Sequence, residues 1–488
     1  MDIGIDVGTS EVKAVLVDEA QAVLATARAA LPISRPQALW SEQDPADWWK
    51  ATLTALADLR SAQPKAYAAT LGLGLSGQMH GATLLDAQDR VLRPAILWND
   101  GRSASQCAEL ERRQPDSRVI TGNIAMPGFT APKLMWVREH EPEVFASVAR
   151  VLLPKDYVRL QLTGEAVSDM SDSAGTLWLD VAARDWSDAM LEATQLQRRH
   201  MPRLVEGSRA SGTLRADLAA RLGLQASVVV AGGAGDNAAS AAGIGVAAPG
   251  TAFISLGTSG VYFVANQAFS PNPEHAVHAF CHCFPDTWHQ MSVMLSAASC
   301  LHWLCGLTHA QSEAQLLEEA SALRADARIP LFLPYLSGER TPHNDPHASG
   351  VFVGLTHDST RAHLARAVLE GVSFAFADGQ QALMAGGARI DCVSLVGGGS
   401  RSASWAQLLA DTLGRTLERR SGAEVGAALG AARLARLARS NESIEAVCTA
   451  PPVRDRFEPD ARRHQVLSQR HARFQRLYAA LKAEMQAE

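Results

Sequence analysis

The first 31 residues alternate short apolar runs with polar turns. The runs IGIDVG, VKAVLVD and AVLATARAAL are joined by GTSE and DEAQ, and this pattern predicts three strands of a β-meander. A helix is predicted next, because Asp44 stands at its N-cap position, Pro45 follows at its first position, and Asp47 lies three residues after the cap. Residues 70–76 are predicted to form a buried strand.

The remainder of the first half mixes strands and helices. Residues 81–98, GATLLDAQDRVLRPAILW, predict a second hairpin, and residues 102–200 are predicted to be mostly helical. The run SVVVAGGAGDNAASAAG at 227–243 is a β-branched strand that breaks into glycines and then into an alanine-rich helix.

After this helix the opening pattern recurs. TAFISLGTSGVYFVAN at 251–266 repeats the first hairpin, VSLVGGGSRSASW at 393–405 predicts a strand, a glycine turn and a helix, and GAALGAARLARLA at 426–438 predicts a helix of small residues. A strand-rich start that occurs twice, each time followed by mixed helix and strand, indicates two related α/β domains that face each other. We predict domains at 1–243 and 244–488, separated near the break AAPGT.

Two Gly-Thr-Ser turns stand at matching places in the two predicted domains. Such a turn exposes consecutive backbone N–H groups and two hydroxyl donors in one arc, which suits phosphate oxygens. One copy is weak evidence, because an ordinary surface turn has the same composition. Two copies in opposed domains predict a polyphosphate held from both sides. The residues of these two loops are Gly8, Thr9 and Ser10 in the first copy and Gly257, Thr258 and Ser259 in the second.

Only the first copy carries charged neighbours. Asp6 precedes the first turn and Lys13 follows it, whereas Ser255 and Tyr262 stand at the corresponding positions of the second copy. Phosphates bound with Mg²⁺ need a hard oxygen ligand for the metal and a cation for the transferred group. These charges therefore mark the end of the site where the γ-phosphate and the metal would lie. The alternative for Asp6 is a strand-end aspartate that caps its own turn.

Asp236 is the candidate general base. It follows GGAG at the end of a predicted strand and begins the alanine-rich helix, where a carboxylate is stabilised and exposed. Asn237 follows it, and the predicted break between the domains is close. A carboxylate at this place can accept the proton of an alcohol that attacks the γ-phosphate. A simple helix cap is the alternative interpretation.

Other glycine-rich and histidine-rich motifs of the chain have simpler interpretations. The glycines of GLGLSG at 72–77 satisfy GxGxxG, but a strand and turn follow them where a dinucleotide-binding motif needs a helix, and the chain has no Gly-Lys pair for a Walker A loop. In EHAVHAFCHC, strand alternation sends His278 and His282 to one face and the cysteines 281 and 283 to the other, which favours packing over a zinc site. Gly397–Gly399 can be a plain turn or, beside the phosphate loops, a surface that a nucleotide approaches closely.

Composition excludes several classes of function. The chain has 488 residues, 47% of them apolar, and a formal net charge of −6, which gives no general attraction to nucleic acid or to an anionic membrane. The start MDIGIDVGTS lacks the basic and apolar regions of a signal peptide. No apolar run is long enough to span a membrane. Seven scattered cysteines suit reduced thiols, so we expect a cytoplasmic protein.

Taken together, these motifs resemble the FGGY family of carbohydrate kinases along nearly the whole chain. The resemblance is carried by IDVGTSEVK, WSEQDPADWW, SGQMHG, WNDGR, PGFTAPKLMW, GAGDN, SLGTSG, the segment from Gly350 through Gly354 to LARAVLEG, and GGGSR, and both family signatures are present, at 128–136 and 350–370. It implies two actin-like (ribonuclease H-like) domains with a catalytic cleft between them, and ATP and Mg²⁺ as cofactors.

Within the family, several segments are most similar to the members that phosphorylate D-xylulose at its 5-hydroxyl; these are SGQMHGATLLD, RPAILWNDGR, LLPKDY, SDMSDSAGTLWLD, MLSAASCL and LPYLSGERTPH. Glycerol kinases have Arg-Glu where this chain has Met79-His80. The resemblance implies that Met79 and His80 line the sugar pocket, that Asp236 takes the 5-OH proton, and that Asn237 helps to hold the sugar. It implies phosphate contacts for Thr9, Ser10 and Lys13 and a Mg²⁺ ligand in Asp6. The ATP contacts are predicted at Gly8, Gly257, Thr258, Ser259, Gly398, Gly399 and Ser400.

Two rival functions remain open from the sequence: a family kinase for another ketose such as ribulose, and a nucleotide-binding regulator that phosphorylates nothing. The expected partners are a small sugar and ATP, without nucleic acid or membrane, and a homodimer is plausible by family analogy. AGGAGDN has one residue more than the AGGGDN expected of close relatives. The path of the loop before Asp236 is therefore left open.

Overall fold

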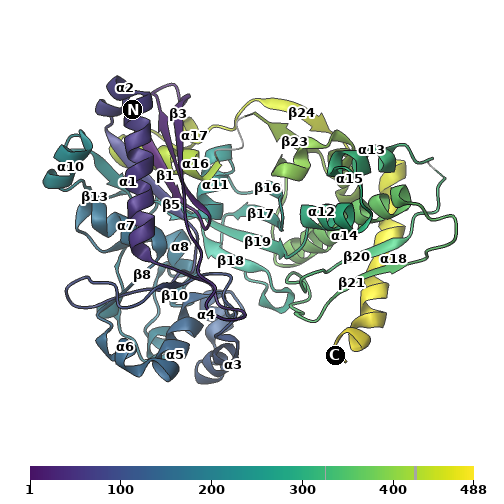
Figure 1. Ribbon diagram of the computed structural model, residues 1–488, viewed down its shortest axis with the longest axis horizontal. Coiled ribbons are helices and arrows are strands. Elements are labelled where there is room, and N and C mark those ends of the chain that lie inside the picture. Colours follow the sequence, from purple (N-terminus) through teal and green to yellow (C-terminus); the bar gives the residue numbers. More distant parts are fainter. Residues whose placement is uncertain (325, 422–425, 488) are drawn as a thin grey trace.

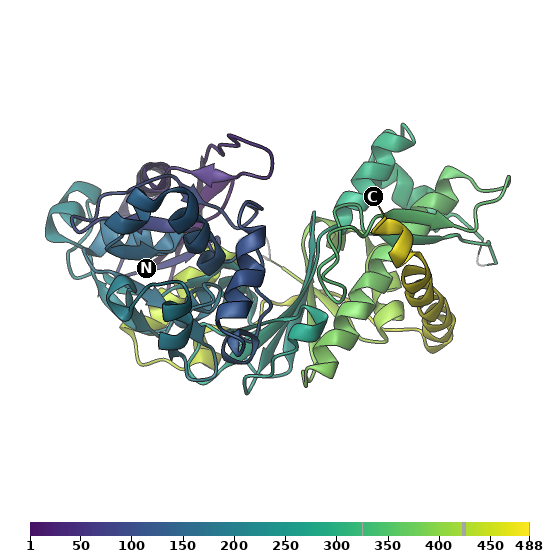
Figure 2. The same ribbon diagram turned by 90° about the horizontal axis from the view of Figure 1, so that it is seen from below.

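The computed structural model describes residues 1–324, 326–421 and 426–487 of the chain. Two lobes lie side by side, and each contains a seven-stranded sheet (Figures 1 and 2). The N-terminal lobe carries the purple and blue segments, and the C-terminal helix lies at the far edge of the green lobe.

The first sheet has the order β13-β14-β5-β1-β2-β3, with β15 also paired to β5. Its strands are β1 (Asp2–Val7), β2 (Glu11–Val17), β3 (Val23–Ala30), β5 (Gly72–Gly77), β13 (Ala210–Thr213), β14 (Val229–Ala231) and β15 (Ala234–Gly235). β1, β2 and β3 pair antiparallel in sequence, which confirms the predicted meander.

The second sheet has the order β18-β19-β17-β16-β22-β23-β24. Its strands are β16 (Thr251–Leu256), β17 (Gly260–Asn266), β18 (His278–Cys281), β19 (Trp288–Met294), β22 (Cys392–Val396), β23 (Leu417–Arg420) and β24 (Val453–Phe457). Six strands repeat the first sheet in order and direction: a central hairpin continued by an antiparallel third strand, with two parallel strands and an antiparallel edge strand on the other side. The predicted pair of related α/β domains is confirmed.

Helices cover both sheets and fill the lower part of the first lobe (Figure 1). In the first half they are α1 (Pro45–Ala62), α2 (Pro64–Ala68), α3 (Ala104–Arg113), α4 (Ser117–Thr121), α5 (Thr130–His140), α6 (Pro142–Ser147), α7 (Pro154–Thr163), α8 (Met170–Ala174), α9 (Asp188–Ala193), α10 (Ala216–Leu222) and α11 (Asp236–Ile244), with the 3₁₀ turn η1 (Arg198–His200). In the second half they are α12 (Ala298–Leu307), α13 (Glu313–Ser321), α14 (Arg361–Ala385), α15 (Ala403–Leu413), α16 (Gly426–Arg439), α17 (Ile444–Val447) and α18 (Ala461–Met485), with η2 (Pro273–His275) and η3 (Gly398–Arg401).

Asp44 caps α1 as predicted, since its carboxylate accepts a hydrogen bond of 2.9 Å from the N–H of Ala46. The second hairpin is only partly confirmed. Bridges between Leu85 and Val91 and between Ala82 and Ile96 join its two arms, while the regular strands of these arms pair with other segments, β6 with β8 and β7 with β4. The short two-stranded sheets of the structure are β4 (Glu42–Gln43) with β7 (Ala95–Ile96), β6 (Thr83–Leu85) with β8 (Arg150–Leu152), β9 (Val167–Asp169) with β12 (Arg203–Val205), β10 (Leu179–Asp180) with β11 (Asp185–Trp186), and β20 (Leu331–Pro334) with β21 (Gly350–Val353).

Helix α16 crosses from the second half of the chain to the first sheet. It packs on β1, β5 and β14 and against α11. Glycines permit this approach: a Cβ at Gly4 would lie 1.9 Å from the carbonyl oxygen of Ala428, and one at Gly74 would lie 1.8 Å from that of Ala431. The GxGxxG spacing in β5 therefore serves helix packing. The division at 243/244 stays a prediction, and one helix from beyond it completes the core of the first sheet.

Apolar residues of β1, β2 and β5 pack with α1 and α7 in one buried cluster, and those of β16 and β22 pack with α12, α14 and α15 in another. Among the described residues, no helix is long and apolar enough to cross a bilayer.

Candidate active site

Asp6 lies in β1 and has one paired residue on each of the two adjacent strands. Lys13 on β2 and Ser76 on β5 are its partners across the sheet, and the Ser76 hydroxyl donates a hydrogen bond of 3.1 Å to its carboxylate. Burial raises the pKa of Asp6, although Ser76 and the charge of Lys13 oppose this effect. A cation bound nearby would further favour the charged form of this carboxylate.

Asp236 is placed beside Asp6 by the same sheet. Residues 234–235 form β15, which pairs with β5 at Ser76 and Gly77, and Asp236 begins α11 directly afterwards. The backbone and side-chain amides of Asn237 donate to its Oδ1 at 2.7 and 2.9 Å. Burial and then the charge of Asp6 raise the pKa of Asp236 to about 7, against the effect of Asn237. A carboxylate with that pKa is suited to accept a proton near neutral pH.

The loop before Asp236 follows a defined path. The N–H of Gly232 donates to the carbonyl of Arg209 at 2.7 Å, and that of Gly233 donates to the carbonyl of Gly207 at 3.0 Å. Gly233 has a φ of 77°, and a Cβ there would lie 2.3 Å from the carbonyl oxygen of Leu75. The AGGAGDN segment thus contains a turn that needs glycine.

A cavity of about 620 Å³ opens between the two halves of the chain. Asp6, Lys13 and Asn237 line it from the first half, and Gly398 and Ser400 line it from the second. Its other lining residues are Ser240, Ile244, Phe253, Ser255, Leu395, Val396, Gly397, Arg401, Arg419, Arg420, Ser421, Gly426, Ala427 and Arg454. The cavity thus brings together five of the predicted site residues. The predicted residues outside its lining are Gly8, Thr9, Ser10, Met79, His80, Asp236, Gly257, Thr258, Ser259 and Gly399.

Four arginines on this cavity were not predicted: Arg401, Arg419, Arg420 and Arg454. The LERR and VRDRF segments carry three of them, and the sequence signal was a pair of basic residues in each of two adjacent strands. Arg419 also donates to the carbonyl oxygen of Ser400 at 2.9 Å, so it supports η3. Arg419 and Arg454 contact Asp455, and Arg420 contacts Glu418, so these carboxylates offset part of the positive charge that the cavity presents to an anionic ligand.

Polar side chains from other segments form hydrogen bonds to the first Gly-Thr-Ser loop. The Thr9 hydroxyl donates to Gln78 at 3.2 Å and accepts from the Trp98 indole N–H at 3.0 Å. The Gln43 amide donates to the carbonyl of Thr9 at 2.7 Å. These three supports were not predicted. They fix the loop that precedes Lys13, and Ser10 is exposed at its tip.

The second loop is fixed differently. The carbonyl of Gly257 accepts from the N–H of Ala298, and that of Thr258 accepts from the Ser299 hydroxyl, both at 2.8 Å. Thr258 and Ser259 are exposed. The hairpin of β16 and β17 is also tighter than the hairpin of β1 and β2. Ser255 pairs with Val261 rather than with Tyr262, the residue that corresponds to Lys13. The sequence repeat is therefore not exact in register.

Gly397, Gly398 and Gly399 follow β22, and different structural requirements explain a glycine at each position. Gly397 has a φ of 90° and abuts the backbone of Leu256, and a Cβ at Gly399 would lie 2.6 Å from the Leu256 side chain. A Cβ at Gly398 would meet no protein atom within 4 Å, and this residue lines the cavity. Packing against Leu256 explains Gly397 and Gly399. At Gly398, only close approach by a ligand would require a glycine.

Met79 and His80 follow β5 and lie next to the base. A Cβ at Gly235, the residue before Asp236, would lie 2.9 Å from the Met79 sulfur. His80 has a φ of 71°, and its Nδ1–H donates to the carbonyl of Gly175 at 2.6 Å. Burial, with Lys133 and Arg340 nearby, lowers the pKa of His80 to about 3. The neutral ring therefore keeps Nε2 as an acceptor for a hydroxyl group.

His278 and Arg340 join this region from the second half of the chain. His278 Nδ1 lies 3.1 Å from the Asn123 side-chain oxygen, and Arg340 donates to its Nε2 at 3.3 Å. The Phe129 ring stands edge-on to both His80 and His278, with centroids 4.8 and 5.5 Å away. Sequence reasoning missed Arg340. In the described part of the chain, no group of three or more His, Cys, Asp or Glu residues could hold a metal ion by itself.

Comparison with known proteins gives a consistent picture. Family models of the FGGY carbohydrate kinases match the chain, the N-terminal domain at residues 1–243 and the C-terminal domain at 252–439. The xylulose kinase of Escherichia coli K12 is 54% identical over 99% of both chains. Two solved structures superpose over 99% of both chains: a xyloylose kinase from Brucella ovis, with 53% identity and a TM-score of 0.96, and the xylulose kinase from Rhodospirillum rubrum, with 31% and 0.94. The two lobes, their shared cleft and these matches together establish that the chain belongs to the FGGY family of carbohydrate kinases.

Proposed function

We propose that this sugar kinase transfers the γ-phosphoryl group of ATP to the 5-hydroxyl of D-xylulose. The observation that carries the proposal is the pair Asp6 and Asp236. One carboxylate faces the interdomain cavity, and the other has a pKa raised to about 7 beside the Met79-His80 segment. The xylulose kinase relatives support the choice of sugar. A cytoplasmic location and a homodimer remain expectations.

In the proposed reaction, Asp236 removes the proton from the sugar hydroxyl while the oxygen of that hydroxyl forms a bond to the γ-phosphorus. The bond between that phosphorus and the bridging oxygen breaks, and ADP leaves with the electron pair. His80 Nε2 and Asn237 orient the sugar. Lys13 and the exposed hydroxyls of the two Gly-Thr-Ser loops hold the phosphates.

The donor set near Asp6 fits Mg²⁺. This ion binds proteins through one or two carboxylates and takes its other ligands from water and phosphate. Asp6 lies on the cavity wall with Ser76 as its one hydrogen-bond donor among the described residues. Bound there, the ion would neutralise phosphate charge. Closure of the lobes around the sugar would exclude water as a competing acceptor.

An ADP-release assay across ketoses and polyols tests this function. D-xylulose is expected to give the highest kcat/KM, with weak ATP consumption when sugar is absent. A higher kcat/KM for ribulose would reassign the substrate. Failure of every sugar to stimulate ATP consumption would instead favour the non-catalytic regulator.

A further inference from the structure

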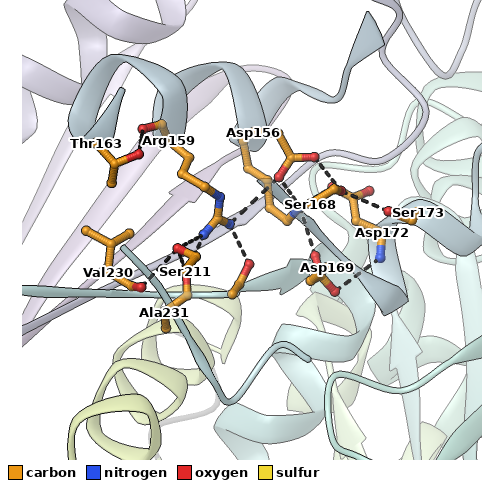
Figure 3. Close-up of polar contacts among 12 residues, drawn as sticks. Asp156, Arg159, Thr163, Ser168, Asp169, Asp172, Ser173, Ser211, Val230 and Ala231 are labelled. Carbon is orange, nitrogen blue, oxygen red and sulfur yellow. Dashed lines mark hydrogen bonds and ion pairs between the residues drawn. The ribbon is translucent and has the colours of Figure 1, made fainter. Parts of the chain in front are cut away.

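A fully buried cluster of charges joins α7 to the segment that carries Asp169 and Asp172 (Figure 3). The Lys155 ammonium is 2.7 Å from Asp156, 2.8 Å from Asp169 and 2.9 Å from Asp172, and none of these side chains is exposed to solvent. Arg159, one turn further along α7, is equally buried and lies 3.7 Å from Asp156. We call these five residues the Lys155 cluster.

The Lys155 cluster holds the start of the loop before Asp236 through Arg159. Its guanidinium donates to the carbonyl oxygens of Ala231 and Gly232 and to the Ser211 hydroxyl, the last at 2.6 Å. Figure 3 shows the Arg159 side chain extending from α7 toward Ser211 and Ala231. These carbonyls belong to the end of β14 and the first residue of the glycine turn.

The same cluster holds the end of the loop through Ser171 on α8. The Ser171 hydroxyl donates to Asp169 at 2.5 Å and accepts from the N–H of Gly235 at 3.1 Å. Gly235 directly precedes Asp236. Helix α8 is also followed by Gly175, whose carbonyl accepts from His80. One buried element therefore contacts both the base segment and the sugar-side histidine.

We infer that the Lys155 cluster, acting through Arg159 and Ser171, positions Asp236 relative to His80 for proton removal from the sugar. The inference rests on the proposed function, because it takes Asp236 as the base. Replacing buried ion pairs by well-packed apolar residues is often neutral or stabilising, so stability alone is a weak reason for this cluster. Misplacement by about 1 Å can cost roughly a hundredfold in rate.

The variants Ser171→Ala and Ser173→Ala form a matched pair. Both serines are buried on α8, but Ser173 donates to the Ser168 hydroxyl at 2.9 Å and does not contact the loop in any hydrogen bond of the described residues. We expect Ser171→Ala to lower the kcat of D-xylulose phosphorylation about tenfold with the KM for ATP unchanged. The acid limb of its pH–rate profile should move to lower pH, because a displaced carboxylate regains water. Ser173→Ala should keep the wild-type limb.

Two further measurements do not depend on the rate of this one variant. Hydrogen exchange of the peptide covering 229–238 should be faster in Ser171→Ala and unchanged in Ser173→Ala. Arg159→Lys keeps the charge but loses the forked contact to two carbonyls, so it should shift the acid limb in the same direction, with folding checked by thermal unfolding.

The inference is overturned if Ser171→Ala keeps the wild-type kcat and the wild-type acid limb of the pH–rate profile. It is also overturned if Ser171→Ala lowers kcat without moving the acid limb, or if Ser173→Ala has the same effects as Ser171→Ala. These results differ from failure of the proposed function. If the proposed function is wrong, the wild-type protein itself would not phosphorylate D-xylulose.

Discussion

The negative charge of Asp6 contributes to the raised pKa of Asp236 at the start of α11. Asp6 lies in β1, and Asp236 begins α11 directly after β15. Both strands pair with β5 at Ser76 and Gly77, so the sheet register fixes the relation of the two aspartates. Asp236 must be ionised to act as a base, so activity is expected to be full above a pH of about 7 and to fall as the pH drops through that value.

Asp6→Asn removes this charge. The acid limb of the kcat/KM profile should move to lower pH, while kcat falls at least about 10²-fold if Asp6 holds the metal. A stopped assay over pH 5 to 9 with excess Mg²⁺ measures both effects. A limb that stays in place would show that Asp6 does not influence the base.

Asp236→Ala should lower sugar phosphorylation by about 10² to 10⁴-fold with ATP binding largely intact. Calorimetric titration with ATP and single-turnover phosphorylation check the two parts separately. Retention of more than about a tenth of the wild-type turnover would remove Asp236 from the role of base.

The double change Met79→Arg with His80→Glu should abolish D-xylulose turnover. Two charges would enter a region where Met79 is buried and the His80 ring is neutral. Turnover of D-xylulose and the thermal midpoint are measured together. An unchanged kcat/KM would place these residues outside the sugar pocket.

Gly398→Ala separates a nucleotide contact from a packing role. A Cβ at Gly398 meets no protein atom, so the thermal midpoint should hold, whereas the KM for ATP should rise. Gly399→Ala is the control, because its Cβ would press on Leu256 and lower the midpoint. An unaltered KM for ATP in folded Gly398→Ala would argue against close approach of the nucleotide.

Gly430→Ala should destabilise the protein by about 3 kcal/mol or more, because its Cβ would lie 1.8 Å from the carbonyl oxygen of Ala239 at the contact between α16 and α11. Gly306→Ala in α12 is the matched control. Its Cβ would meet nothing within 4 Å, so helix propensity should make this change neutral or stabilising by up to about 1 kcal/mol. Urea unfolding of both variants gives the comparison.

Local patterns were sufficient to predict much of this structure. Asp44 and Pro45 marked the start of α1, and alternation marked the first meander, because both signals act within a few residues. The two Gly-Thr-Ser hairpins identified the duplicated sheets. Asp6 was predicted from its charge beside the first of these turns, and Asp236 from its position between a strand and the alanine-rich helix. The proximity of these two aspartates, in contrast, depends on pairing between distant strands.

The missed features depend on contacts distant in sequence. Gln43 and Gln78 support the first loop from other segments, and Arg340 reaches His278 from a loop 62 residues later. The pairing of β6 with β8, which joins residues 83–85 to 150–152, was not predicted beside the hairpin at 81–98. The Lys155 cluster was invisible because LLPKDY and SDMSDS are separate in sequence and nothing local shows that their charges are buried together.

The crossing of α16 has a consequence for synthesis of the protein. The first sheet presents glycine-lined strands to a helix that ends at Arg439. A nascent chain that has emerged only through the first half lacks this cover, so its sheet exposes apolar surface to solvent or to chaperones until most of the polypeptide has left the ribosome. Fragments cut between the lobes should consequently aggregate when expressed alone and recover solubility when the segment containing α16 is supplied.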